Sequence, residues 1–325
     1  MRQLILKVQS FLILLVLVSA NVQAQKSPVD MDRFIDDLMK RMTLEEKIGQ
    51  LNLPVTGEIT TGQAKSSNVA KRIRAGEVGG LFNLKGVERI RDVQKQAVEE
   101  SRLGIPLLFG MDVIHGYETV FPIPLGLSCT WNMKAIEESA RIAAIEASAD
   151  GICWTFSPMV DVSRDPRWGR GQETYGEDPY LTSQMGIAVV KGLQGPENEK
   201  YRKLLACAKH YAVHSGPEWS RHTANLNNVS PRDLWETYLP AFKALVQKAD
   251  VREVMCAYQR LDDDPCCGNT RLLQQILRDE WGFKYLVVSD CGAIADFWTS
   301  HKSSSDAVHA AVKGTMAGTD VECGY

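Results

Sequence analysis

Short apolar runs alternate with longer segments of helical periodicity along most of this chain, and this alternation limits its fold more than any other feature. The eight runs are Leu51–Val55, Val78–Phe82, Pro106–Met111, Cys153–Met159, Leu204–Ala208, Glu253–Ala257, Leu286–Ser289 and Met316–Val321. The segments between them include Val87–Arg102, Met133–Ala149, Pro179–Gln194, Pro231–Lys248 and Asn269–Trp281. Strand followed by helix, repeated about eight times, predicts an α/β fold of the (β/α)8 TIM-barrel type. A doubly wound sheet usually has fewer strands and a glycine-rich phosphate loop, which the sequence lacks.

The first 24 residues have the pattern of a signal peptide. Two basic residues precede the apolar stretch 11–18, and small residues at 22–24 stand at the usual cleavage spacing. The apolar stretch is short for a membrane span, which makes an uncleaved anchor helix the weaker alternative. We therefore expect a signal peptide over residues 1–24, a barrel domain over 25–325, and a periplasmic or secreted protein with no membrane insertion after signal removal.

Composition and cysteine spacing exclude some classes of function. The net charge of −3 and the pI near 6.1 argue against a nucleic-acid partner. An exported chain can form disulfides, and this one has eight cysteines. Cys153, Cys207 and Cys256 lie in apolar runs, where a thiol packs as a small hydrophobe. The pair Cys266–Cys267 lies in a predicted loop, so a bridge to another loop cysteine stays open. No spacing resembles a zinc site, and we expect neither a metal nor a cofactor.

One predicted strand ends in a carboxylate. The run Leu286–Ser289 leads directly into Asp290, and Gly292 then breaks it. Ligands and chemistry gather at the carboxyl ends of strands in parallel α/β folds, so Asp290 is placed where a nucleophile would act. The alternative is structural, because an aspartate there can also cap the following helix.

Polar residues follow other predicted strands as well. Asp112 follows the third, the stretch Asp161–Glu173 follows the fourth, Lys209-His210 ends the fifth, and Met255–Tyr258 ends the sixth. Each has an ordinary structural explanation when taken alone. Together at strand carboxyl ends they favour a polyol ligand, because carboxylates, Lys, Arg and His all bind sugar hydroxyls. Nearby cations are also expected to keep Asp290 ionised.

Several motifs resemble those of glycoside hydrolase family 3, the exported bacterial β-glucosidase and β-xylosidase group. They are Arg164-Asp165-Pro166-Arg167-Trp168-Gly169-Arg170, Lys209-His210-Tyr211, Val288-Ser289-Asp290, Gly176–Leu181 and Phe121-Pro122. The resemblance runs from about Met42 to Glu322 and implies a retaining β-glycosidase that acts on β-linked gluco- or xylo-oligosaccharides.

The resemblance also implies roles for individual residues. Asp290 would be the nucleophile that forms the glycosyl-enzyme intermediate. Asp112, Arg170, Lys209 and His210 would bind hydroxyls of the nonreducing-end sugar. Met255 and Tyr258 would line the same subsite, with Tyr258 close to the nucleophile.

The chain departs from the two-domain pattern of the family. There the acid/base glutamate comes from a second α/β domain after the barrel, whereas this chain stops at Tyr325. We therefore expect that domain, the acid/base residue and the last barrel helix to be missing, and the chain to be a fragment. Glu173 follows the arginine motif closely and is expected to orient Arg170.

Other interpretations of the function and of the sugar stay open. The single-domain β-N-acetylhexosaminidases of the family use an Asp-His pair after strand five, where this chain has His222 but not the supporting aspartate. The same pocket could also belong to a sugar-binding module without turnover. For the sugar itself, the stretch Gly110–Gly116 resembles glucosidases, whereas Gly171–Tyr175 and Ser289–Cys291 resemble xylosidases. We expect glucose, with xylose as the alternative.

Overall fold

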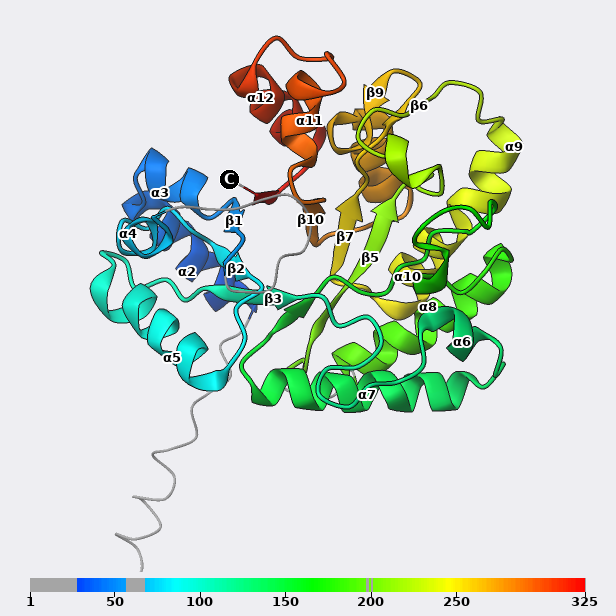
Figure 1. Cartoon of the computed structure of the whole chain (residues 1–325). Coiled ribbons are helices and arrows are strands. Elements are labelled where there is room, and N and C mark those ends of the chain that lie inside the picture. The colour runs from blue at the N-terminus through cyan, green and yellow to red at the C-terminus, as the bar shows by residue number, and fades with distance from the viewer. Residues whose placement is uncertain (1–27, 57–67, 197–198, 200, 325) are drawn as a thin grey trace, which may run out of the picture. The chain divides into compact units, whose positions relative to one another are not determined.

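The computed structural model describes residues 28–56, 68–196, 199 and 201–324 (Figure 1). The predicted signal peptide lies outside these residues. Helix α2 (Pro28–Arg41) belongs to a separate compact unit, residues 1–43. It has Asp30 in its first turn and Lys40 and Arg41 in its last turn, an arrangement that suits the helix dipole. The remainder of the described chain forms the second unit, which contains the sheet and the cavity discussed below.

Six parallel strands form the main sheet of the second unit (Figure 1). Their order is β10 (Leu286–Ser289), β7 (Glu253–Cys256), β5 (Leu205–Tyr211), β4 (Trp154–Thr155), β3 (Leu108–Met111) and β2 (Gly80–Phe82). All six fall within predicted apolar runs or overlap them. The prediction of a parallel α/β fold is therefore confirmed, and the carboxyl ends of these strands lie at one edge, as parallel pairing requires.

Two further strands pair with each other and connect to both ends of the main sheet. β1 (Asn52–Pro54) lies parallel to β11 (Glu322–Gly324). An isolated bridge joins Val55 to Phe82 beside β2, and another joins Val321 to Val288 in β10. Each of the eight strands thus has a neighbour on both sides.

The eighth predicted strand is wrong in its position. Residues 316 and 317 end helix α12 (Ala307–Ala317), and the strand begins only at Glu322. Gly318, with φ 112°, ends the helix in the left-handed region, where glycine is favoured. The apolar run therefore spans a helix end, a turn and the approach to a strand, which hydrophobicity alone does not separate.

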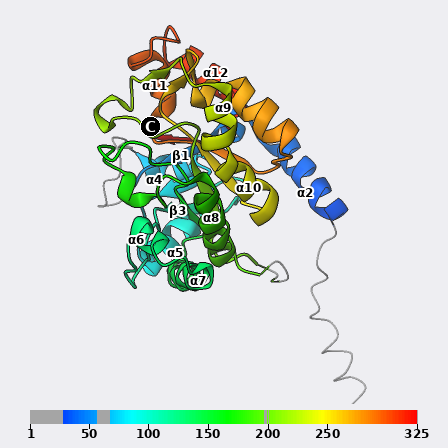
Figure 2. The ribbon, with the colours of Figure 1, turned by 90° about the vertical axis from the view of Figure 1, so that its right-hand side faces the viewer.

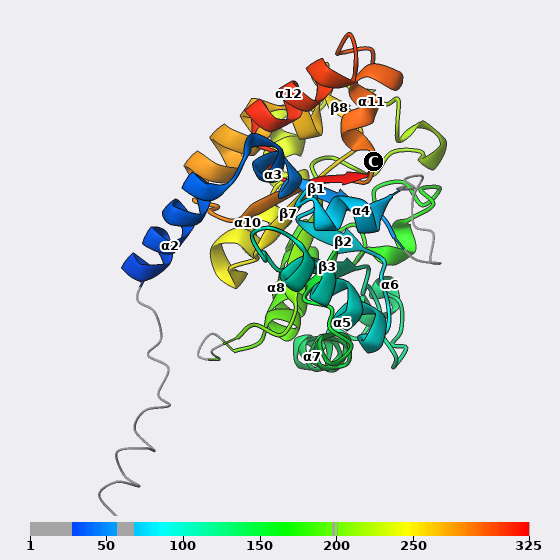
Figure 3. The ribbon, with the colours of Figure 1, turned by 90° about the vertical axis from the view of Figure 1, so that its left-hand side faces the viewer.

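Helices connect successive strands and cover the outer side of the sheet (Figures 1 and 2). They are α3 (Leu44–Gly49), α4 (Val69–Arg74), α5 (Val87–Lys95), α6 (Pro124–Ser128), α7 (Met133–Ala149), α8 (Pro179–Gln194), α9 (Pro231–Asp233), α10 (Pro240–Ala249), α11 (Ala293–Thr299) and α12, with π-helical segments at Gln96–Glu100, Leu234–Tyr238 and Arg271–Glu280. Figure 3 shows α4 and α5 next to β2 and β3. The loops contain short 3-10 turns at Gly171–Glu173, Glu218–Ser220 and Cys266–Gly268. They also contain a small sheet of three strands, β6 (Asn225–Leu226), β8 (Arg260–Leu261) and β9 (Asp264–Pro265).

The pair α7 and α8 shows how the sequence fixes these elements. Asn132 caps α7 by accepting from the Ala135 amide, and Asp178 caps α8, which has a proline in its first turn. Alanines at helical spacing form the buried face of α7. Gly192 of α8 lies so close that a Cβ there would be 2.5 Å from the Ala140 Cβ. Small side chains on both helices therefore set their close packing.

Cysteines form two disulfides, Cys256–Cys267 and Cys291–Cys323. The expectation that Cys256 is a free thiol is therefore wrong, and the partner of Cys267 comes from a strand and not from a loop. Cys153 and Cys207 are free, as expected from their apolar surroundings. Over the part of the chain that the structure describes, none of the helices is both long and apolar enough to span a bilayer.

Candidate active site

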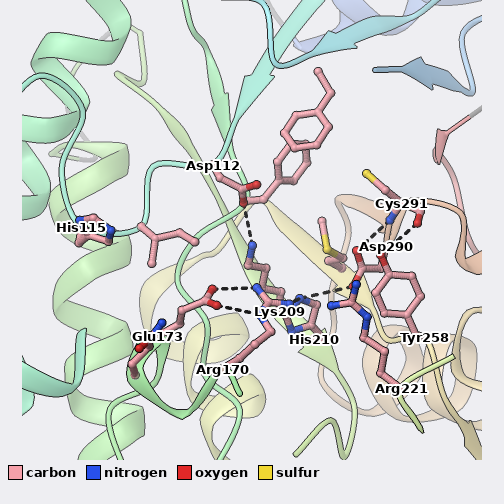
Figure 4. A pocket seen from close by; sticks show the side chains of 15 residues that line it. Asp112, His115, Arg170, Glu173, Lys209, His210, Arg221, Tyr258, Asp290 and Cys291 are labelled. Atoms are coloured by element: carbon pink, nitrogen blue, oxygen red, sulfur yellow. Dashed lines mark hydrogen bonds and ion pairs between the residues drawn. The ribbon is translucent and has the colours of Figure 1, made fainter. Parts of the chain in front are cut away.

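A cavity of about 430 Å³ opens at the carboxyl ends of the parallel strands (Figure 4). The structure brings together around it all seven residues that the sequence singled out, namely Asp112, Arg170, Lys209, His210, Met255, Tyr258 and Asp290. They come from β3, the loop after β4, β5, β7 and β10 or the residues just beyond. The volume falls within the usual range of small-molecule sites.

Asp290 lies buried at the end of β10 with one oxygen engaged. Its Oδ1 accepts a hydrogen bond from the Cys291 amide at 2.8 Å. Its Oδ2 has no hydrogen-bond partner among the described residues, and His210 Nε2 lies 3.5 Å from it. The carboxylate does not cap the following helix, since the residue before α11 is Gly292 and no side chain caps it. Asp290 thus presents one oxygen that the protein itself does not occupy.

Burial and neighbouring charges shift the pKa of Asp290 in opposite directions. Burial raises the pKa of its carboxyl group above 3.8, while the positive charges of Arg170 and Lys209 act to lower it. The expectation that nearby cations hold the carboxyl ionised is therefore too simple, because burial is the larger effect on its pKa.

Lys209 and Asp112 form an ion pair across the cavity. Lys209 Nζ donates to Asp112 Oδ1 at 2.8 Å, and the lysine side chain is 4 % exposed while that of Asp112 is 24 % exposed. Lys209 and His210 are consecutive residues of β5, yet both line the cavity. The register between β5 and β7 shifts between Ala208 and Tyr211, and such an irregularity re-aims side chains that would otherwise alternate.

Arg170 is held by two neighbours. It makes a two-pronged ion pair with Glu173, with N–O distances of 2.9 and 2.8 Å. Its Nη1 lies 3.1 Å from His210 Nε2. Although burial acts to raise the pKa of Glu173, the hydrogen bonds from Arg170 lower it overall. These contacts match the expectation that Glu173 orients Arg170.

The same contacts fix the tautomer of His210. An arginine can only donate, so Nε2 of His210 is the acceptor and Nδ1 carries the proton. Nδ1 then donates to Asp161 Oδ2 at 2.9 Å, and the His210 amide donates to the same oxygen. Burial lowers the pKa of His210 well below its ordinary value. His210 is therefore a neutral ring locked between Asp161 and Arg170.

Several residues of the site were not singled out by the sequence. His115, Gln172, Arg221 and Cys291 also line the cavity. Asp161 does not line it but orients His210. The signal for Asp161 was present, because it follows the apolar end of a strand as Asp290 does.

His222 is not among the residues that line the cavity. Its Nδ1 lies 2.7 Å from Asp296 Oδ2, and its Nε2 accepts from Arg221 Nε at 3.1 Å. An aspartate does support this histidine, although it comes from α11 and not from the same loop. Because both ring nitrogens are engaged away from the cavity, the geometry does not favour His222 as the acid/base of a hexosaminidase-type site.

Comparison of the chain with known proteins finds one family. The model of the "Glycosyl hydrolase family 3 N terminal domain" matches residues 43–323. A xylan 1,4-beta-xylosidase of Xylanibacter ruminicola is 61% identical over 247 residues, which cover 69% of this chain and 28% of that protein. A periplasmic beta-glucosidase of Salmonella typhimurium is 41% identical over 295 residues, or 91% of this chain and 38% of that one.

A solved structure agrees with the sequence matches. The β-glucosidase from Listeria innocua in complex with isofagomine superimposes with a TM-score of 0.78 at 36% identity, and the match covers 90% of this chain and 41% of that one. The chain thus spans well under half the length of these three relatives.

Proposed function

The chain belongs to glycosyl hydrolase family 3, and we propose that it forms the sugar pocket and carries the nucleophile of a retaining β-glycosidase. One observation carries the proposal. Asp290 is buried at the floor of a polar cavity with Oδ2 unoccupied by any described residue. Buried Asp161 and Glu253 also keep one oxygen without a partner, but neither lines the cavity, so Asp290 is the one of the three whose free oxygen a ligand in the cavity can meet.

The proposed reaction follows from that oxygen. Oδ2 attacks the anomeric carbon while the bond to the leaving oxygen breaks, and the electron pair passes to that oxygen, which takes a proton from an acid. In the second step the conjugate base of that acid takes a proton from water, the water oxygen bonds to the anomeric carbon, and the bond from that carbon to Oδ2 breaks, which releases the sugar and restores the carboxylate and the acid. Lys209, Arg170 and Asp112 suit the hydroxyls of the sugar, because they offer fixed donors and acceptors on one wall.

The proton donor is a separate question. A retaining mechanism needs a second carboxyl group about 5–5.5 Å from the first. Of the described carboxylates that line the cavity, Asp112 is paired with Lys209 and Glu173 with Arg170. Since each of these carboxylates is already engaged by a cationic side chain, we assign the acid/base role to neither and propose that it comes from a second domain.

For the sugar, we propose glucose at the nonreducing end of a β-glucoside. Asp112 is a partly exposed carboxylate of the cavity, and it can accept from several hydroxyls of a hexose, including that of the exocyclic hydroxymethyl group. Xylose lacks that group, so the Asp112 carboxylate would lose one hydrogen-bond donor. The second candidate is a β-xylosidase, which the 61%-identical relative favours by its name. Comparing kcat/KM on matched aryl β-glucosides and β-xylosides decides between the two.

Fold and location form part of the proposal. We propose that the eight strands close into a (β/α)8 barrel, supported by the bridges that join β1 and β11 to the main sheet. We also propose an exported protein that lies in the periplasm or outside the cell, supported by the signal-like N-terminal sequence and by a relative named as periplasmic.

The nucleophile is tested by covalent labelling. A 2,4-dinitrophenyl 2-deoxy-2-fluoro-β-glucoside should form a stable ester, because its leaving group needs no proton and its fluorine slows hydrolysis of the intermediate. Peptide mass spectrometry should place the label on Asp290, and the Asp290→Asn variant should stay unlabelled. A label on another carboxylate would refute the assignment. Sugar binding without any label would identify a binding module.

A further inference from the structure

Asp161 is a buried carboxylate that does not line the cavity, and the proposed reaction gives it no role. It lies in the segment after β4, which stays paired with β5 almost up to this residue. The Val160 amide donates to the Lys209 carbonyl at 2.9 Å, and an isolated parallel bridge joins Met159 to Lys209. This pairing brings the Asp161 side chain to that of His210, and each of the two is 1 % exposed.

One oxygen of Asp161 accepts two hydrogen bonds from His210. Oδ2 lies 2.9 Å from the His210 amide nitrogen and 2.9 Å from Nδ1 of its ring. The amide can only donate, which marks Oδ2 as an acceptor. Nδ1 therefore carries the ring proton, and Nε2 keeps a lone pair. The contact on the other side of the ring agrees, because Arg170 Nη1 lies 3.1 Å from Nε2 and can only donate to it.

The lone pair of Nε2 faces the candidate nucleophile. Nε2 lies 3.5 Å from Asp290 Oδ2, the oxygen that has no hydrogen-bond partner among the described residues (Figure 4). Two acceptors cannot bond to each other, so His210 leaves this oxygen free. If the proton moved to Nε2, His210 would donate to Oδ2. A hydrogen bond to the charged form of a carboxylate lowers its pKa and weakens it as a nucleophile.

We propose that Asp161 keeps the attacking oxygen of Asp290 free, because it holds the ring proton of His210 on Nδ1 and away from Nε2. Asp161 is a positioning residue, since it acts on the nucleophile through the His210 ring. This inference rests on the proposed function, because it takes Asp290 as the group that attacks the anomeric carbon.

Two substitutions separate the acceptor of Asp161 from its charge. Asp161→Leu removes the acceptor, so a proton on Nδ1 would be buried without a partner, and it is expected on Nε2, where Asp290 accepts it. Asp161→Asn removes the charge but keeps an oxygen, which the His210 amide selects because it can only donate. Both variants lack the carboxyl group, so a difference between them reports the hydrogen bond to His210. Asp161→Ala, which also lacks an acceptor, serves if Asp161→Leu does not fold.

The position of the ring proton can be measured directly. Nitrogen-15 magnetic resonance of the chain labelled at its six histidines distinguishes the two tautomers, and His210→Phe assigns the signal of His210. Wild type and Asp161→Asn should carry the proton on Nδ1, whereas Asp161→Leu should carry it on Nε2.

Labelling by the fluoro-glucoside measures the effect on Asp290. The maximal rate in Asp161→Leu should be about 10- to 100-fold below that in Asp161→Asn, and the pH at which the rate halves on the acid side should be about one unit lower. Both are the sizes expected of one hydrogen bond to a charged group. In a His210→Phe background the two substitutions should give the same pH, because the donor is gone. A shift caused by looser packing around Asp290 would persist there.

Other cationic or titratable groups also face these side chains, namely Arg170, Lys209, Arg221, His214 and Tyr258. The two arginines and the lysine carry their charge throughout the acid range. Burial lowers the pKa of His214 to about 3 and raises that of Tyr258, so both are neutral where Asp290 titrates. A difference in this pH between the two Asp161 variants therefore reports Asp290.

The outcomes separate the two proposals. A ring proton that stays on Nδ1 in Asp161→Leu would overturn the inference while the proposed function stands. Equal labelling of Asp161→Leu and Asp161→Asn would overturn it as well. Labelling of the wild-type chain on a carboxylate other than Asp290 would refute the proposed function, whatever the tautomer of His210.

Discussion

The disulfide Cys291–Cys323 ties the residue after the candidate nucleophile to β11, and removing it should affect both stability and the site. The perturbation is the double substitution Cys291→Ala with Cys323→Ala. The bond closes a loop of 32 residues. Loop-closure entropy then gives a loss of about 3.7 kcal/mol in the free energy of unfolding, and about 2.8 kcal/mol for the 11-residue loop of Cys256–Cys267. With a typical unfolding entropy for 325 residues, these values correspond to Tm decreases of about 5–6 °C and 4 °C.

The two disulfides should differ in their effect on the nucleophile. The Cys291 amide donates to Asp290 Oδ1, and the Cys323 amide donates to the Ser289 hydroxyl. Without the covalent link the end of β10 can shift away from β11, and a misplacement near 1 Å costs about 100-fold in rate. Cys256→Ala with Cys267→Ala is the comparison variant, because the Cys256 carbonyl, which accepts from the Asp290 amide at 3.2 Å, belongs to the backbone and is kept by the substitution. It should lower Tm with little effect on labelling of Asp290.

The assay has three parts. Thiol titration of the denatured chain should find four thiols before reduction and eight after it. Differential scanning calorimetry gives Tm for each variant, and the rate of labelling by the fluoro-glucoside reports on Asp290. Eight thiols without reduction would show that the disulfides do not form. Equal slowing of labelling in both double variants would refute the argument that Cys291–Cys323 positions the nucleophile.

Three further predictions concern the cavity. Glu173→Gln should weaken sugar binding about 10-fold, because Arg170 loses the ion pair that aims it; calorimetric titration measures this, and undiminished binding would contradict the role. Asp290 must be ionised to attack, and burial raises its pKa, so the rate of labelling should fall as the pH drops through a value above 3.8. Because the charge of Lys209 acts to lower this pKa, Lys209→Met should move the fall to higher pH, whereas Lys134→Met on the surface should not. The described cavity assigns no proton donor, so the chain should react with a dinitrophenyl glucoside but hardly with cellobiose, and azide should speed its turnover; efficient cellobiose hydrolysis unaffected by azide would show that residues 26–325 contain an acid/base.

The strands and most of the site could be read from the sequence because both depend on local patterns. A buried parallel strand is a short apolar run, and the residue that ends it lies at the catalytic edge whatever the rest of the chain does. The sequence alone therefore groups Asp112, Lys209, His210 and Asp290. Arg170 does not lie at the end of a predicted strand, and it was assigned to the site only through the resemblance of its motif to the family.

Tertiary structure decided the pairings between distant residues. Asp161 with His210, His222 with Asp296, and Cys291 with Cys323 join positions 49, 74 and 32 residues apart. The limits of β11 also depended on the fold, since Gly318 ends α12 inside an apolar run and β1 then determines which residues pair. The periodicity of apolar residues predicts single helices and strands, because it depends only on residues close together in the sequence. Which side chains meet across the cavity depends on the path of the whole sheet, because contacts between distant segments form only once that path brings them together.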